Sequence, residues 1–258
     1  MIQRLNSHIS DLDLMKKYPK DIFHKGDLSL LNKRRVSIVG TRKPNQYAKQ
    51  FTHLLAQELS NHNICIVSGA AMGIDAIAHN GAGYSNTIAV AGTGLNIRYP
   101  AINKNLIIEI ENNGLMLSQF ENNQQATRYT FPLRNELVVA LGEVLIVAQA
   151  DLKSGTMRSV EYALKMNKPI YVLPHRLNDS EATNRLLQDG KAKAIYNIED
   201  FIENLVGCKN EIKSKDSFIE YCKTNPTYDE AMSMYGSEVF EYELLEKIKV
   251  QDGSIIVV

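Results

Sequence analysis

The chain has 258 residues, of which 44% are hydrophobic and 22% are charged, as is usual for a globular protein. Its 29 basic and 29 acidic residues cancel to a formal net charge of zero. This balance excludes binding to nucleic acid by bulk charge, although it leaves room for a local basic groove. The three cysteines and six histidines follow no disulfide or metal-ligand spacing, so the sequence predicts no metal site and no cofactor.

The charges are distributed unevenly. Residues 1–35 hold 8 basic and 4 acidic residues, residues 36–206 hold 15 of each, and residues 207–258 hold 6 and 10. We expect residues 1–35 to form a mostly helical lead-in to the main domain. The apolar runs are shorter than a signal peptide or a membrane helix needs, so we expect a cytoplasmic protein that does not bind membranes.

From residue 36 onward, short apolar runs alternate with stretches of helical length. The runs are rich in valine, isoleucine and leucine and lack polar alternation, which is typical of strands covered on both faces. The predicted strands are residues 36–39, 64–67, 87–91, 115–118, 143–148 and 170–173. The predicted helices are residues 44–61, 73–82, 103–113, 133–141 and 154–167. This βαβ series predicts an α/β fold with a doubly wound, mainly parallel sheet over residues 36–206.

The pattern changes after residue 206. We expect a polar linker at residues 207–215 and a small winged-helix-like domain at residues 216–258. Its predicted elements are helices near 216–224, 228–234 and 237–247, followed by two short strands around Gly253. The last helix carries four glutamates and one lysine, and phosphates would repel a recognition helix of that charge. We therefore expect this domain to contact protein, or to cap the main domain.

Glycines and cations follow the predicted strands. In an open α/β sheet, ligands bind beyond the carboxyl ends of the strands, where small residues let backbone N–H groups approach an anion. Several such turns side by side suit a polyanion better than a single phosphate. The candidate binding residues are Gly40, Thr41, Arg42, Lys43, Ser68, Gly69, Gly92, Thr93, Phe131, Arg134, Asn135, Lys153, Ser154 and Gly155.

Other side chains near these turns have two interpretations each. The rings of Tyr47, Tyr99, Tyr129 and Phe131 could stack on bases or pack at the rim of the core. Asp75 and His79 lie one helical turn apart and could form a general acid/base pair. Nothing nearby supplies a nucleophile, so the spacing favours a capping and packing pair.

Five segments together resemble the DprA (Smf) family, the DNA-processing proteins of bacterial transformation. They are Val39-Gly40-Thr41-Arg42-x-Pro44, Val67-Ser68-Gly69-Ala70-Ala71-x-Gly73-Ile74-Asp75-x-x-Ala78-His79, Tyr99-Pro100-x-x-Asn103, Phe131-Pro132-x-Arg134-Asn135 and Ser154-Gly155-Thr156. The resemblance covers residues 36–200 and implies an extended Rossmann-like domain that binds single-stranded DNA without sequence preference. It also implies a homodimer that is not an enzyme and that hands incoming DNA to the RecA recombinase during natural transformation. The family's DNA contacts map onto Gly40, Thr41, Arg42, Arg134 and Lys153.

Three positions depart from the family's pattern. Glu136 stands where a second arginine is usual, Gln119 where a glutamate usually follows the serine, and His175 where a glycine usually follows the proline. The exchange at Glu136 replaces a cation by an anion. From it we expect weaker DNA binding close to Arg134.

Two other functions suit a scaffold of this kind. One is a nucleotide-processing enzyme, such as the lysine-decarboxylase-like phosphoribohydrolases, whose Gly-Gly-x-Gly-Thr-x-x-Glu loop holds a ribose phosphate. The nearest counterpart here, Ser154-Gly155-Thr156 with Glu161, lacks the glycine pair and has a different spacing. The other is a nucleotide-sensing protein that uses one loop for a mononucleotide. The series of small and basic turns, together with the resemblance, favours the single-stranded DNA-binding mediator.

Overall fold

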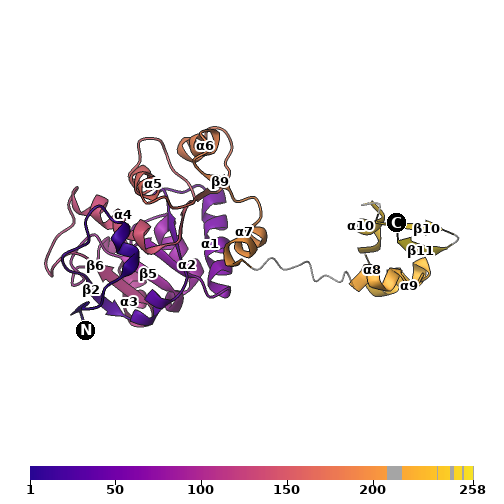
Figure 1. Cartoon of the computed structure of the whole chain (residues 1–258), viewed down its shortest axis with the longest axis horizontal. Helices are drawn as coiled ribbons and strands as arrows, with labels where there is room; N and C mark the ends of the chain where they lie inside the picture. Colours follow the sequence, from indigo (N-terminus) through magenta and orange to yellow (C-terminus); the bar gives the residue numbers. More distant parts are fainter. Residues whose placement is uncertain (208–216, 237, 245–246, 252, 258) are drawn as a thin grey trace. The chain divides into compact units, whose positions relative to one another are not determined.

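The computed structural model describes residues 1–258 except 208–216, 237, 245–246, 252 and 258. It divides into two compact units, Met1–Ile202 and Glu203–Val258, each with a hydrophobic core of its own (Figure 1). The division falls inside helix α7 (Ile198–Val206), slightly before the boundary expected at residue 206. The predicted linker at 207–215 lies, apart from Gly207, outside the described residues.

The first unit is built on a nine-stranded sheet whose central strands are the apolar runs of the sequence. These strands are β3 (Arg35–Val39), β4 (Cys65–Gly69), β5 (Thr87–Val90), β6 (Leu115–Ser118), β7 (Val144–Val147) and β8 (Ile170–Val172). All six pair in parallel with their neighbours among them, and each begins and ends close to its predicted bounds. The predicted α/β, Rossmann-like class is confirmed.

The order of the strands reverses at β3, and the site predicted at such a reversal lies beyond the carboxyl ends of the strands. The order is β1-β2-β6-β5-β4-β3-β7-β8-β9, with β9 at Lys193–Ala194. The chain moves outward from β3 to β6 and then returns to the other side of β3 to begin β7. Strands β3 and β7 pair in parallel from Val36–Val144 to Val39–Val147. A doubly wound sheet binds its ligands at such a reversal.

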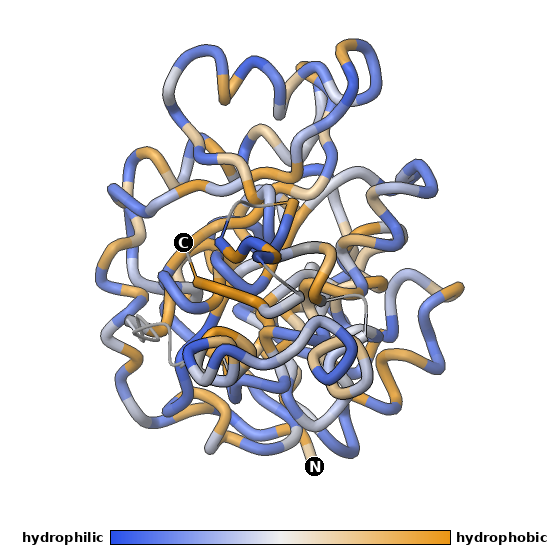
Figure 2. The backbone as a smooth tube through the Cα atoms, turned by 90° about the vertical axis from the view of Figure 1, so that its right-hand side faces the viewer, coloured by the Kyte–Doolittle hydropathy of each residue, from blue (hydrophilic) through white to orange (hydrophobic). Residues whose placement is uncertain are grey.

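Helices cover both faces of the sheet. They are α1 (Gln46–Asn61), α2 (Ile74–Ala82), α3 (Lys104–Asn113), α4 (Thr130–Leu141) and α5 (Thr156–Lys165). Successive strand residues face opposite sides. Ile88 and Leu115 pack in the cluster that holds residues of α4 and α5, whereas Ala89 and Met116 pack with α3 and α2. Figure 2 shows hydrophobic and hydrophilic segments alternating along the chain, as burial of one side of each helix requires.

The N-terminal segment differs from the prediction, and the expectation of a mostly helical lead-in at residues 1–35 is wrong. It contains the edge strands β1 (Gln3–Arg4) and β2 (Phe23–Gly26) and the 3₁₀ helices η1 (Ser10–Leu14) and η2 (Leu28–Asn32). Pro19 and Gly26, the latter with φ of 110°, do not suit a continuing helix. Strand β2 pairs antiparallel with β6, which satisfies the backbone groups at that edge.

The elements after β8 were not predicted as such. They are α6 (Glu181–Gln188), the two-residue strand β9, and α7. Two further 3₁₀ helices, η3 (Tyr84–Asn86) and η4 (Ala101–Asn103), lie before β5 and α3. Within the described residues, no helix combines the length and the hydrophobicity needed to cross a membrane.

Beyond the end of α7, the described residues of the second unit form three helices and a hairpin, the elements predicted for a small winged helix. They are α8 (Ser217–Cys222), α9 (Tyr228–Tyr235), α10 (Glu238–Leu244), β10 (Ile248–Gln251) and β11 (Ser254–Val257). Helix α9 begins with a capping box in which Thr227 and Glu230 exchange side chain-to-backbone hydrogen bonds. Strands β10 and β11 pair antiparallel, and the core gathers around Phe218 and Ile255.

Candidate functional site

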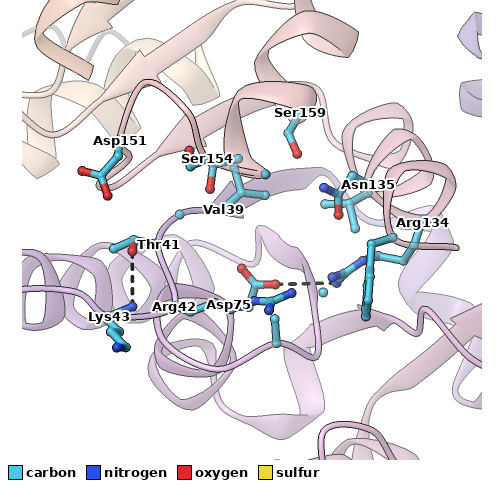
Figure 3. Close-up of a pocket in the computed structure, with 17 residues that line it drawn as sticks. Val39, Thr41, Arg42, Lys43, Asp75, Arg134, Asn135, Asp151, Ser154 and Ser159 are labelled. Carbon is cyan, nitrogen blue, oxygen red and sulfur yellow. Dashed lines mark hydrogen bonds and ion pairs between the residues drawn. The ribbon is translucent and has the colours of Figure 1, made fainter. Parts of the chain in front are cut away.

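A pocket of about 540 Å³ opens at the carboxyl ends of β3, β4 and β7 (Figure 3). Its walls are the turns after β3 and β4, the beginning of α4, and the loop from β7 into α5. The lining residues are Val39, Gly40, Thr41, Arg42, Lys43, Gly69, Ala71, Asp75, Phe131, Arg134, Asn135, Val138, Asp151, Ser154, Gly155, Thr156 and Ser159. Three cations and two carboxylates therefore face this space.

The turn after β3 is held by its backbone. The Thr41 N–H donates to the Gln149 carbonyl at 2.8 Å, and the Thr41 carbonyl accepts from the Ile74 N–H at 3.2 Å. A Cβ added at Gly40 would lie 2.5 Å from Ile74 Cγ1, so only glycine permits this close approach. With the turn fixed, the exposed side chains of Arg42 and Lys43 stand at the rim of the pocket.

Arg134 forms the floor of the pocket. It lies on α4 and is only 6% exposed. Its Nη1 lies 3.6 Å from Asp75 Oδ2 and donates to the Val90 carbonyl at 3.4 Å. A Cβ added at Gly69 would lie 1.1 Å from that Nη1, so the missing side chain makes room for the guanidinium. Burial lowers the pKa of Arg134, while the charge of Asp75 acts in the opposite direction.

Asp75 is the buried carboxylate of the pocket. Burial raises its pKa to about 6, although the charges of Arg134 and Arg42 act to lower it. His79, expected to pair with Asp75, has other partners: its Nε2 lies 2.9 Å from the Gly69 carbonyl, and its Nδ1 lies 2.6 Å from the Thr87 hydroxyl. Burial lowers the pKa of His79 to about 4, so this imidazole is neutral at physiological pH.

Two buried polar atoms of the pocket find no hydrogen-bond partner among the residues that the structure describes. They are Arg134 Nε and Ser154 Oγ. A buried polar group without a partner costs about 1–3 kcal/mol, and a ligand with acceptor oxygens would remove that cost. Ser154 directly precedes the N-terminal turn of α5, where backbone N–H groups and the helix dipole also favour an anion. The pocket is therefore suited to an anionic group.

Aromatic rings stand beside the cations. The Cζ atom of Arg42 lies 5.6 Å from the ring centroid of Phe131, and the Tyr99 centroid lies 6.0 Å from it at an interplanar angle of 40°. Tyr99 is 45% exposed. These residues border a second pocket of about 30 Å³, which is roughly the space of one water molecule. A base would therefore stack on the outer faces of the rings.

Most of the predicted site residues meet in the main pocket. The ten that line it are Gly40, Thr41, Arg42, Lys43, Gly69, Phe131, Arg134, Asn135, Ser154 and Gly155. Gly92 borders the small second pocket, where an added Cβ would lie 3.2 Å from Phe131 Cδ1. Lys153 is exposed on the loop beside Ser154 but does not belong to the lining.

Two of the predicted residues have structural roles instead. The buried Ser68 hydroxyl donates to the Ile38 carbonyl at 2.6 Å, and the buried Thr93 hydroxyl donates to the Ile97 carbonyl at 3.0 Å. Of the remaining ring candidates, Tyr47 packs against Phe51 and His175, with ring centroids 4.7 and 5.2 Å away. Tyr129 is 66% exposed.

Three residues of the pocket region have positions that the sequence analysis did not predict. Asp75 lines the pocket, as its place at the first turn after a glycine-rich strand end could have suggested. Arg128 is exposed just before α4, with its Cζ 4.7 Å from the Tyr129 centroid. Glu136 lies outside the pocket lining, where its buried carboxylate accepts from the Lys16 N–H at 2.9 Å. The expected effect of Glu136 on DNA binding close to Arg134 stays a prediction, and the position of its carboxylate does not support it.

Comparisons with known proteins agree on one family. The profile of the family described as DNA recombination-mediator protein A matches residues 5–206. DNA processing protein DprA from Streptococcus pneumoniae is 35% identical over 196 residues, which are 74% of this chain and 69% of that protein. The protein of the same name from Bacillus subtilis is 35% identical over 192 residues, which are 72% of this chain and 64% of that protein.

Solved structures give the same answer. DNA processing protein A from Helicobacter pylori, a protein with a described single-stranded DNA binding mode, superposes with a TM-score of 0.78 and is 43% identical. The likeness covers 80% of this chain and 96% of that one. The structure of DprA from Streptococcus pneumoniae superposes with a TM-score of 0.73 at 33% identity, over 78% of this chain and 73% of that one.

Proposed function

The chain belongs to the DNA recombination-mediator protein A family, also called DprA or Smf, and on this premise we propose that it binds single-stranded DNA without sequence preference. We assign the binding to the pocket at the carboxyl ends of β3, β4 and β7. One observation carries this proposal. The same pocket holds hydrogen-bond donors without a partner, at Arg134 and Ser154, and exposed cations at its rim.

The phosphates would be held first by the rim. Arg42 and Lys43 project from a turn whose backbone is fixed, so their charges are concentrated at one place although the whole chain is neutral. Cations that neutralise phosphates release bound counterions, so the affinity should fall steeply as salt rises. Arg134 Nε and Ser154 Oγ would then donate hydrogen bonds to phosphate oxygens.

The bases would remain outside. The rings of Tyr99 and Phe131 lie next to the guanidinium of Arg42, which gives a base a flat surface beside its own phosphate. Stacking of this kind contributes about 1–3 kcal/mol per base and tolerates any base, because every base has a π-face. The arrangement therefore favours binding that is independent of sequence.

The wider role is part of the same proposal. We place the protein in the cytoplasm, as a homodimer that protects incoming single-stranded DNA during natural transformation and loads the RecA recombinase onto it. The support for these partners is membership of the family. The acidic composition of α10, with three glutamates and neither lysine nor arginine, supports a protein-contact role for the second unit.

We further propose that the protein acts without catalysing a reaction on the DNA. The alternative of a phosphoribohydrolase needs a carboxylate beside the loop at residues 154–156. Glu161, the nearest candidate by sequence, is half exposed, pairs with Arg158 at 3.0 Å and does not belong to the pocket lining. Asp75, which does line the pocket, is engaged with Arg134.

Fluorescence polarisation with a labelled oligo(dT) tests the proposal. We expect the wild-type protein to bind oligo(dT) more tightly than the matched duplex, and thymidine monophosphate to compete only weakly, since one nucleotide occupies one phosphate position. Equal competition by thymidine monophosphate would support the mononucleotide sensor instead. Release of free base from nucleoside monophosphates would support the enzyme.

A further inference from the structure

A buried carboxylate in an anion-binding pocket is unusual, and Asp75 is such a group. It is 7% exposed, and it lies opposite the walls formed by Ser154 and Asp151 in Figure 3. A phosphate that entered this space would approach a negative charge as well as the cations. The protein therefore either tolerates repulsion between Asp75 and its ligand or removes it.

The charged and titratable groups around Asp75 come from several elements. Arg134 approaches from α4 and Arg42 from the turn after β3. On α2 itself, His79 follows one turn later and stays neutral. Helix α1, which packs against α2, contributes no residue to the pocket lining. Lys43 and Asp151, both exposed, complete the charged lining of the pocket.

In the free protein, Asp75 positions Arg134. The pair is 3.6 Å apart, and the side chains of Arg134 and Asp75 are 7% and 10% exposed. Gly69 provides the space for both, because an added Cβ would lie 1.1 Å from the guanidinium and 2.7 Å from Asp75 Oδ2. The carboxylate thus offsets the charge of a buried guanidinium as long as no phosphate does so.

When a phosphodiester binds, this balance changes. The phosphate brings a second negative charge to Arg134, and the two anions then share one buried cation. Two like charges in one site favour protonation of the weaker acid. A phosphodiester stays ionised throughout the physiological range, so the proton goes to the carboxylate.

We propose that Asp75 takes up a proton when single-stranded DNA enters the pocket, so that it positions Arg134 in the free protein and becomes neutral in the complex. This inference rests on the proposed function of the pocket. It predicts that single-stranded DNA binds more tightly as the pH falls. A side chain with a purely structural role would give no such pH dependence.

The range of the effect follows from linkage. In the free protein the pKa of Asp75 is about 6, and a bound phosphodiester raises that pKa further. Well below pH 6, Asp75 is protonated in both the free and the DNA-bound protein, and the affinity is constant. Between pH 6 and the higher pKa of the complex, the affinity rises as the pH falls, by at most about tenfold per pH unit for one proton.

The test is a titration with labelled oligo(dT) at constant ionic strength, across the range from about pH 5.5 to 8.5. Thymine and phosphodiesters do not titrate there, so the protein alone produces any change. We expect wild-type affinity to be at least about threefold higher at pH 6 than at pH 8. Asp75→Asn should give a flat profile. The control His175→Gln, outside the pocket, should keep the wild-type slope.

A second measurement needs no variant. Calorimetry of wild-type protein with oligo(dT) near pH 7, in buffers of different ionisation enthalpy, reports the protons taken up on binding. We expect net uptake that declines toward pH 8.5. A flat wild-type profile, a slope that persists in Asp75→Asn, or zero uptake would each overturn the inference while leaving DNA binding intact. Absence of oligo(dT) binding at every pH would instead contradict the proposed function.

Discussion

The pocket of the first unit and helix α10 of the second unit differ in local charge, although the whole chain is neutral. At the pocket, a few cations stand on turns that the backbone fixes, next to donors that lack partners among the described residues. In the second unit, helix α10 has three glutamates and no basic residue, and Phe240 and Leu244 are 54% and 86% exposed. From this difference we expect the placement of charge, rather than its total, to decide which surface binds a polyanion.

The two units also differ in the interactions that stabilise each of them internally. The pocket depends on a polar pair, Asp75 and Arg134, that fits only because residue 69 is glycine. The second unit depends on rings: Phe218 is fully buried, with the centroids of Tyr235 and Tyr242 each 5.0 Å from its own. Changes in one unit should therefore leave the other intact, and the following variants test that separation.

Gly69→Ala should have the largest effect. Its Cβ would displace the Arg134 guanidinium from Asp75, and breaking this buried ion pair costs up to about 3–5 kcal/mol of unfolding free energy. The affinity for oligo(dT) should fall by about tenfold or more, because the floor cation is lost. Denaturant unfolding and polarisation measure the two effects. Gly155→Ala is the matched control for stability, since its Cβ meets open space; an equal loss of unfolding free energy in both variants would contradict the assigned geometry.

Phe218→Ala should destabilise the second unit to a similar extent. Removing a fully buried phenylalanine costs about 3–5 kcal/mol, while the affinity of the first unit for oligo(dT) should change by less than about twofold. Differential scanning calorimetry, with the transition of the first unit as the reference, measures the unfolding transition of the second unit. Phe240→Ala, at a half-exposed position, should leave that transition in place. A large loss of oligo(dT) affinity in Phe218→Ala would break the separation between the units.

Arg42→Ala should lower the affinity without unfolding the protein. A lost charge-assisted contact costs about 1.5–3 kcal/mol, which is about a ten- to hundredfold loss of oligo(dT) affinity. Lys43→Ala should cost less, because an ammonium lacks the planar fork that grips a phosphate with two hydrogen bonds. Equal and small losses in both variants would count against the rim assignment.

Lys153→Ala should lower the oligo(dT) affinity less than Arg42→Ala does. The residue is exposed and lies outside the pocket lining, so its removal should cost less than about 1 kcal/mol of binding free energy. Polarisation across a range of salt concentrations tests for a direct contact, since the loss of one phosphate contact would reduce the slope of log affinity against log salt by about 0.7. A loss as large as that of Arg42→Ala would extend the interface onto the loop before α5.

The sequence predicts the parts of this site that depend on local patterns. Apolar runs without alternation identify β3 to β8, and the order of βαβ units places the turns with Arg42 and Ser154 at one edge. The pairing of Asp75 with Arg134 depends instead on how α4 docks over Gly69, which no local pattern encodes. The edge strand β2 depends in the same way on the exposed backbone of β6.

The orientation of Glu136 shows most clearly what local sequence patterns do not predict. It follows Arg134 by two positions on α4, so the two side chains leave the helix on different sides. Arg134 reaches the pocket, whereas Glu136 meets the backbone of the N-terminal segment at Lys16. A family pattern of residue types identifies the motif. It does not say which side of the helix each residue of the motif faces.

The salt dependence of oligo(dT) binding tests the central claim most directly. Log affinity should fall linearly with log salt concentration in wild-type protein, and Arg42→Ala should reduce the steepness of that line by about 0.7, the value for one phosphate contact on a single strand. The control Arg158→Ala, an exposed cation on α5 paired with Glu161, should leave the slope unchanged. An unchanged slope in Arg42→Ala, or an equal reduction in both variants, would contradict the account.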